Sequence, residues 1–147
     1  ADSLNNLALL LFFQDRNTEA EPYYRQALAI RRRITPGNNP DTAAVLNNMA
    51  RCIEKQKRPE EALPLFEESL KMYQGLFPSG HPSTANCWAN YAHCLGELDR
   101  LPEALAEADK AVALAKLICP EGDGTRIKCL DIQAELRQRS GQARPGG

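Results

Sequence analysis

The chain has 147 residues, of which 43% are hydrophobic and 25% are charged, a composition typical of a globular domain with its own core. A formal net charge of -1 provides no overall positive field, which argues against nucleic acid or an anionic membrane as a partner. The sequence contains no apolar stretch long enough to cross a membrane and no recognisable signal peptide, so we expect a cytoplasmic protein.

A five-residue segment recurs along the chain at a fixed interval of 42 residues. Its copies begin at Leu4 (LNNLA), Leu46 (LNNMA) and Trp88 (WANYA), and a more divergent copy begins at Leu130 (LDIQA). A fixed period between about 20 and 50 residues is typical of solenoids and other repeat arrays. The sequence therefore predicts three full units, at 1–42, 43–84 and 85–126.

Each unit is predicted to contain two helices. In the first helix of the first unit, four apolar residues at helical spacing form one buried stripe: Leu4, Leu7, Ala8 and Leu11. The second helix follows a short polar break and stops near a proline, at Pro36, Pro78 or Pro120. We expect Asp41 or Thr42, and Ser83 or Thr84, to cap the next first helix.

The last segment is predicted to be a single capping helix over residues 125–141. Lys128, Arg137 and Arg139 give it the polar outer surface of a terminal repeat. Residues 142–147 are predicted to be a disordered tail, which leaves one continuous array over residues 1–141. Because the sequence begins inside a repeat and without methionine, we expect it to be a piece of a longer protein.

These residues resemble the tetratricopeptide repeat (TPR). The family's first-helix pattern matches Trp88, Tyr91, Ala92 and Leu95, and its second-helix pattern matches residues 104–120. The 42-residue period, the LNNLA segment and the EAEPYY segment at 19–24 are similar to the kinesin light chain subtype. The resemblance implies an all-α fold, a right-handed α-solenoid of antiparallel helix pairs whose first helices line an inner groove. It also implies a protein–protein interaction module, which binds a protein or peptide partner.

The sequence favours neither an enzyme nor a metal or cofactor site. Four of the five cysteines lie in predicted helices, at Cys52, Cys87, Cys94 and Cys129, and we expect reduced cysteines in the core. The two histidines lack the spacing of zinc ligands, and no phosphate-binding loop or nucleophile motif is present.

Three asparagines recur on the side of the first helix opposite the buried stripe, at Asn6, Asn48 and Asn90. A carboxamide can pair with both the N–H and the C=O of a peptide unit. If neighbouring helices lie about 8–10 Å apart, an extended peptide rising about 3.3 Å per residue meets one asparagine about every third residue. The sequence thus favours capture of a peptide backbone. Alternatively, the carboxamides bond to one another or to nearby backbone and only fix the stacking of repeats.

Five further residues are predicted to line the same groove. Asn5 and Asn47 flank the central asparagines, and Arg51, Lys55 and His93 form a modest basic patch suited to a carboxylate of the partner.

A second hypothesis is that the chain is a structural or self-association element of a larger multidomain signalling or scaffold protein. The apolar face within residues 1–13 would then stack on another copy or on further repeats. Phe12 and Phe13 at the groove end either anchor a ligand or pack against such a repeat. The run Arg31–Arg33 is expected to be solvated on the outer surface.

Overall fold

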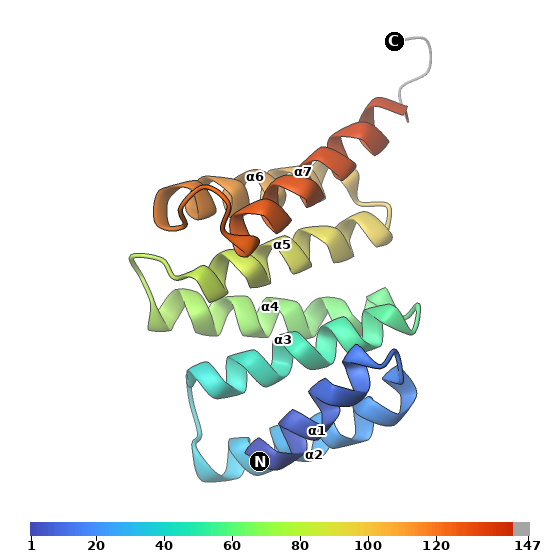
Figure 1. Cartoon of the computed structure of the whole chain (residues 1–147), viewed down its shortest axis with the longest axis vertical. Helices are drawn as coiled ribbons and strands as arrows, with labels where there is room; N and C mark the ends of the chain where they lie inside the picture. The colour runs from blue at the N-terminus through green and yellow to red at the C-terminus, as the bar shows by residue number, and fades with distance from the viewer. Residues whose placement is uncertain (143–147) are drawn as a thin grey trace. The chain divides into compact units, whose positions relative to one another are not determined.

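The structure is a computed structural model and describes residues 1–142. Within these residues it contains helices and no strand (Figure 1). The helices are α1 (Asp2–Phe13), α2 (Asn17–Ile34), α3 (Pro40–Lys55), α4 (Pro59–Leu76), α5 (Pro82–Glu97), α6 (Leu101–Ile118) and α7 (Gly124–Gln142). The predicted fold class, an all-α array of antiparallel helix pairs, is confirmed. The predicted tail lies outside the described residues, except that the backbone of Gln142 ends α7.

The chain divides into two compact units, residues 1–76 and residues 77–147. Unit 1 contains the helix pairs α1–α2 and α3–α4, with α2 packed on α3 and a smaller contact between α1 and α3. Unit 2 contains the pair α5–α6 and the helix α7, which packs on both of them.

The helix α3 begins at Pro40, one residue before Asp41, which is the earlier of the two residues predicted to cap it. Pro40 occupies its first position, where a missing backbone N–H is no loss. Asn39 caps the helix, because its side-chain oxygen accepts hydrogen bonds from the backbone N–H groups of Asp41 at 2.9 Å and Thr42 at 3.3 Å. The prediction that Asp41 or Thr42 caps this helix is therefore wrong. Both residues lie inside its first turn.

The helix α5 repeats this arrangement with a different capping residue. Pro82 stands at its first position, and Nδ1 of His81 accepts a hydrogen bond from the backbone N–H of Ser83 at 3.0 Å. The His81 ring also stacks on Phe77, with ring centroids 4.3 Å apart. The predicted caps Ser83 and Thr84 are wrong for the same reason, because the proline places the helix start ahead of them.

The core of unit 1 lies where α3 packs on α2 and α4. Tyr24 of α2, Leu46 of α3 and Phe66 of α4 are each 0% exposed. A hydrogen bond of 2.7 Å from the Ser69 hydroxyl to the Ala43 carbonyl also ties α4 to α3. Such close packing of helix pairs provides the rigid frame on which the surface of α1 and α3 is held.

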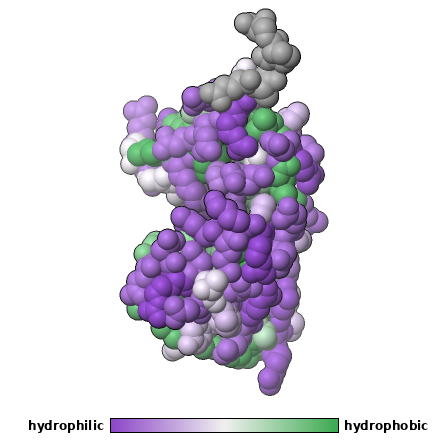
Figure 2. Space-filling view, turned by 90° about the vertical axis from the view of Figure 1, so that its right-hand side faces the viewer, coloured by the Kyte–Doolittle hydropathy of each residue, from purple (hydrophilic) through white to green (hydrophobic). Residues whose placement is uncertain are grey.

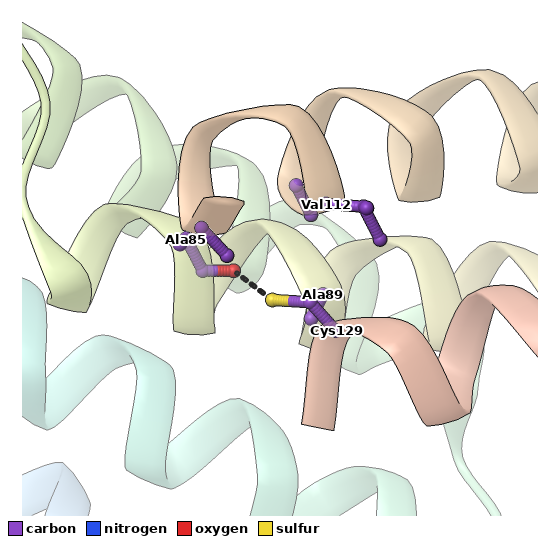
Figure 3. Close-up of a cluster of buried hydrophobic side chains, with 6 residues drawn as sticks. Ala85, Ala89, Val112 and Cys129 are labelled. Atoms are coloured by element: carbon purple, nitrogen blue, oxygen red, sulfur yellow. Dashed lines mark hydrogen bonds between the residues drawn. The ribbon is translucent and has the colours of Figure 1, made fainter. Parts of the chain in front are cut away.

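The core of unit 2 is built mainly from small side chains. Ala85 and Ala89 of α5, Val112 of α6 and Cys129 of α7 point toward one another (Figure 3), and Trp88 packs against this cluster. The Cys129 thiol donates a hydrogen bond of 3.6 Å to the Ala85 carbonyl, drawn as the dashed line. Small residues allow the three helices to approach closely, and Trp88 supplies bulk beside them.

All five cysteines are free and buried, as predicted. Burial raises the pKa of Cys52 to about 11, and it raises the pKa of Cys129 to about 11 as well. Both thiols therefore stay protonated near neutral pH and pack as small apolar groups.

One part of the predicted buried stripe is exposed. Leu7 is 40% exposed, whereas Phe12, which was placed on the groove side, is only 8% exposed. Phe12 is covered because the guanidinium of Arg51 lies over its ring, 4.8 Å from the centroid. Elsewhere the surface seen in Figure 2 is mostly hydrophilic, with scattered hydrophobic areas.

The same backbone turn joins the two helices of every pair. Asp15, Lys57 and Asp99 have φ values of 61°, 63° and 60°, in the left-handed region. In the second pair, the N–H of Arg58 bonds to the carbonyl of Ile53 at 3.3 Å, which is the long hydrogen bond of a Schellman motif. A residue with a side chain costs about 1–2 kcal/mol in this conformation.

The substitution Lys57→Gly is expected to raise the free energy of unfolding of unit 1 by about 1 kcal/mol, because glycine adopts positive φ without steric cost. The Lys57 side chain is exposed and loses no packing. Urea denaturation followed by circular dichroism measures the change. Lys71→Gly, at an exposed position inside α4, is the control and is expected to lower stability by about 1 kcal/mol. An unchanged or lower stability of Lys57→Gly would contradict the prediction.

Candidate functional site

In unit 1, the helices α1 and α3 meet at Phe12 and Arg51, and this contact organises the surrounding surface. The stacked guanidinium is held against the ring by a cation–π interaction, which leaves its edge available to a partner. Burial lowers the pKa of Arg51, although Tyr24 and Glu54 act in the opposite direction. The guanidinium remains charged at any physiological pH.

Two of the predicted asparagines lie on this surface of unit 1. Asn6 of α1 is exposed and Asn48 of α3 is half-buried, and neither carboxamide forms a side-chain hydrogen bond to another described residue. Lys55 is exposed one turn beyond Arg51. The α1–α3 face is the surface formed by Asn6, Asn48, Arg51 and Lys55. It offers two open carboxamides and two cations.

The flanking asparagines are less accessible. Asn47 is 5% exposed, and Asn5 is half-buried with a side-chain oxygen that is buried and has no hydrogen-bond partner. The equivalent residue of α5, Ala89, is 0% exposed, which shows that this position of the repeat faces the interior. Burial of Asn47 therefore argues against a direct contact with a partner.

In unit 2, α7 lies along α5 on the side predicted to form the groove wall. Lys128 donates a hydrogen bond to the side-chain oxygen of Asn86 at 2.8 Å, and Arg139 donates one to the carbonyl of Gly96 at 2.9 Å. Asn90 lies between these two contacts along α5 and is 5% exposed. The predicted third carboxamide is thus much less accessible than Asn6 or Asn48.

His93 lies on the same side of α5, in an acidic setting. Its Nε2 is 3.8 Å from a carboxylate oxygen of Glu97, which also lies 3.8 Å from a guanidinium nitrogen of Arg139. The His93 side chain is 33% exposed. A carboxylate is therefore one of its charged neighbours, and His93 belongs to unit 2, whereas Arg51 and Lys55 belong to unit 1.

Arg31 has a role in unit 1 that the sequence did not predict. Its guanidinium pairs with Asp2 at the start of α1 and with Asp41 at the start of α3, the latter at 3.1 Å. The Arg31 side chain is 15% exposed, and Arg32 pairs with Glu68 of α4 at 2.7 Å. The expectation of a solvated arginine run is therefore wrong for Arg31, whereas Arg32 and Arg33 are exposed. The partner carboxylates lie far from the run in sequence, so no local pattern indicates them.

A second polar cluster lies between α2 and α3. A carboxylate oxygen of Glu21 accepts hydrogen bonds of 2.8 Å from Gln56 and 2.8 Å from Arg58, and Arg25 binds the other oxygen at 2.6 Å. Burial alone raises the pKa of Glu21, but the hydrogen bonds from Arg58, Gln56 and Arg25 outweigh it and hold the pKa below its ordinary value.

Among residues 1–142, no group of three or more histidine, cysteine, aspartate or glutamate side chains is arranged to hold a metal ion. The helices of the described part of the chain are too short or too polar to span a membrane.

Comparison with solved structures identifies similar helix-pair arrays. The chain is similar to the nearly identical TPR-like repeats of a protein assigned as a kinesin light chain in Podosopora anserina, with a TM-score of 0.85, 21% identity and coverage of 96% of this chain and 67% of that one. BtubC (BKLC) from P. vanneervenii matches with a TM-score of 0.75, 20% identity and coverage of 98% and 65%. The Sgt2 TPR domain from Aspergillus fumigatus matches with a TM-score of 0.65, 16% identity and coverage of 99% and 85%.

These likenesses show the fold, and the chain spans about two thirds of the first two structures. A comparison with curated protein sequences gives no match. A sequence profile described as tetratricopeptide repeat matches residues 1–75 and 41–117, in register with the helix pairs. With its kinesin light chain-like array of helix pairs, the chain belongs to the tetratricopeptide repeat family.

Proposed function

We propose that the chain is a protein-interaction module and that the α1–α3 face binds an extended segment of a partner protein. Tetratricopeptide repeats generally mediate protein–protein interaction, which supports the general part of the proposal. The observation that carries the specific part is the open state of Asn6 and Asn48, whose carboxamides are unused by the described residues. If these two asparagines served only to fix repeat stacking, they would bond to each other or to neighbouring backbone.

The chemistry of the α1–α3 face favours backbone capture with a preference for acidic segments. Each carboxamide can donate to a peptide carbonyl and accept from a peptide N–H. Arg51, oriented by the Phe12 ring, can bind a carboxylate through two nitrogens, and Lys55 adds a second positive charge nearby. The free, buried cysteines are compatible with a reducing compartment, and the proposal places the protein in the cytoplasm.

Asn6→Ala combined with Asn48→Ala is expected to weaken peptide binding. Random 15-residue peptides displayed on phage are selected on the full chain, and the affinity of a selected peptide is measured by fluorescence anisotropy. Loss of two net hydrogen bonds, each worth about 0.5–1.5 kcal/mol, predicts a loss of affinity on the order of tenfold. Arg51→Gln is expected to weaken acidic peptides selectively.

Asn38→Ala, in the exposed loop between α2 and α3, is the matched control and is expected to bind normally. The thermal melt of Asn6→Ala/Asn48→Ala should stay near that of the parent chain. Unchanged peptide affinity together with a large drop in the melting temperature would contradict the proposal and support the stacking role.

A further inference from the structure

The residue directly after α2 differs from its equivalents in the other two helix pairs. Phe77 follows α4 and stacks on His81, with ring centroids 4.3 Å apart, and Cys119 follows α6 and is 4% exposed. Thr35 follows α2 and is exposed, and its hydroxyl forms no hydrogen bond with another described residue. The position is used for packing in two pairs, whereas in the first pair it presents a hydroxyl to solvent.

The segment around Thr35 is open to solvent. Pro36, Gly37 and Asn38 are exposed, and no atom of a more distant residue lies within 4 Å of the place that a Cβ would take at Gly37. Ile34 is 73% exposed and contributes little packing to the last turn of α2. Thr35 itself has left the helix, with φ −131° and ψ 78°. An enzyme can therefore bind this segment in an extended form with little local unfolding.

The residue after Thr35 restricts which enzymes can use this hydroxyl. Thr35–Pro36 is the one step of the sequence at which a serine or threonine precedes a proline. Proline has no N–H, fixes its own φ and keeps the residue before it extended. The prolines that follow α4 and α6 are preceded by Phe77 and Cys119, which carry no hydroxyl. An acceptor hydroxyl and a following proline therefore occur together only here.

Arginines that precede Thr35 provide groups that can bind a phosphate. Arg33 is exposed, and its side chain forms no ion pair or hydrogen bond with another described residue. Arg32 lies three residues before Thr35, on the same side of the helix end, and its side chain is 51% exposed and pairs with Glu68 at 2.7 Å. Arginine binds phosphate through two nitrogens, and a phosphothreonine carries more negative charge than the single carboxylate of Glu68. Both guanidinium groups can thus turn to a phosphate on Thr35.

We propose that Thr35 is a phosphorylation site, modified by a proline-directed protein kinase, and that Arg32 and Arg33 hold the phosphate. The kinase transfers the γ-phosphoryl group of Mg²⁺-bound ATP to Oγ1 of Thr35. The new P–O bond forms as the bond to the β-phosphate oxygen breaks, ADP leaves, and the hydroxyl proton passes to the catalytic aspartate of the kinase. The product adds a charge of about −1.5 to −2 near neutral pH. This charge lies in the connection between α2 and α3, outside the α1–α3 face.

The test uses the full chain, Mg²⁺-bound ATP and an active proline-directed protein kinase. Mass spectrometry of the intact chain and of its peptides is expected to show one phosphoryl group, on Thr35. Thr35→Val should abolish its incorporation. Pro36→Ala leaves the hydroxyl in place but should slow incorporation at least on the order of tenfold, because the alanine N–H finds no acceptor in a groove that selects proline.

Thr18 is the internal control for exposure alone. It is exposed in the first turn of α2, but Glu19 rather than proline follows it, and it should stay unmodified. Circular dichroism of Thr35→Val and Pro36→Ala should match that of the parent chain, because both residues are exposed and lie outside the helices. A difference in incorporation then reports on the site rather than on folding.

The two arginines are tested on the phosphorylated chain by phosphorus NMR. Guanidinium groups stabilise the doubly charged phosphate, so the phosphate of the parent chain should take up a proton at lower pH than in Arg32→Gln/Arg33→Gln. The expected difference is on the order of 0.5 pH unit. Arg16→Gln, at the other end of α2, is the matched control and should leave the titration unchanged.

A folded chain that incorporates no phosphate on Thr35 overturns the proposal. Equal rates for Pro36→Ala and the parent chain overturn the assignment to a proline-directed kinase, since recognition would then not depend on the proline. A phosphate that titrates at the same pH with and without Arg32 and Arg33 overturns their part in holding it.

Discussion

Replacing Phe66 with alanine is expected to lower the free energy of unfolding of unit 1 by about 3–5 kcal/mol. The Phe66 side chain is 0% exposed, and α4, which carries it, packs on α3. Its removal leaves a cavity in the packing of α4 on α3, which the rigid helix pair can fill only in part. Amide hydrogen exchange in α3 and α4 measures the change. Fluorescence of Trp88, the one tryptophan of the chain, follows unit 2 separately.

The third repeat provides a matched control for this substitution. It has Ala108 where the second repeat has Phe66, and Trp88 where the second repeat has Leu46. At these two positions the large aromatic side chain thus lies on the second helix in the second repeat and on the first helix in the third repeat. Adding Leu46→Trp to Phe66→Ala copies this exchange and should recover part of the lost stability. A double variant no more stable than Phe66→Ala, or a single variant within 1 kcal/mol of the parent chain, would contradict the cavity explanation.

The helix pairs could be predicted from the sequence because one short-range signal is repeated. Apolar residues at helical spacing, found again 42 residues later, place every helix, and prolines mark where α2, α4 and α6 end. Helix ends were harder to predict, because two effects compete there. Pro40 sets the start of α3, which makes Asn39 the cap and leaves the favourable capping residue Thr42 buried in the first turn.

The candidate site was only partly predictable. Helical geometry predicts on which side of α1 and α3 the residues Asn6 and Asn48 lie, but not which carboxamides stay open. Accessibility depends on the neighbouring helix, and in unit 2 α7 lies along α5, where Asn90 is 5% exposed. The contact of Arg51 with Phe12 joins residues on different helices, so periodicity within one helix cannot indicate it.

Glu21→Gln is expected to lower the free energy of unfolding of unit 1 by about 2 kcal/mol at pH 7, because hydrogen bonds to a charged group contribute about 1.5–3 kcal/mol. The Glu21 side chain is 12% exposed and joins α2 to Gln56 and Arg58 beyond the end of α3. Glutamine keeps the shape but loses the charge and one acceptor. Glu61→Gln is the control: that carboxylate is exposed, pairs with Arg58 within its own helix pair, and should have a much smaller effect.

The pH dependence separates the charge of Glu21 from its packing. Because its pKa in the folded chain lies below the ordinary value of 4.5, the ionised carboxylate stabilises unit 1 fully above pH 4.5. That contribution is lost as the pH falls from 4.5 through the lowered pKa. The stability difference between the parent chain and Glu21→Gln should therefore be constant near neutral pH and shrink in this acidic range. Urea denaturation between pH 3 and pH 7 measures it. A difference independent of pH would mean that shape, rather than charge, makes Glu21 important between α2 and α3.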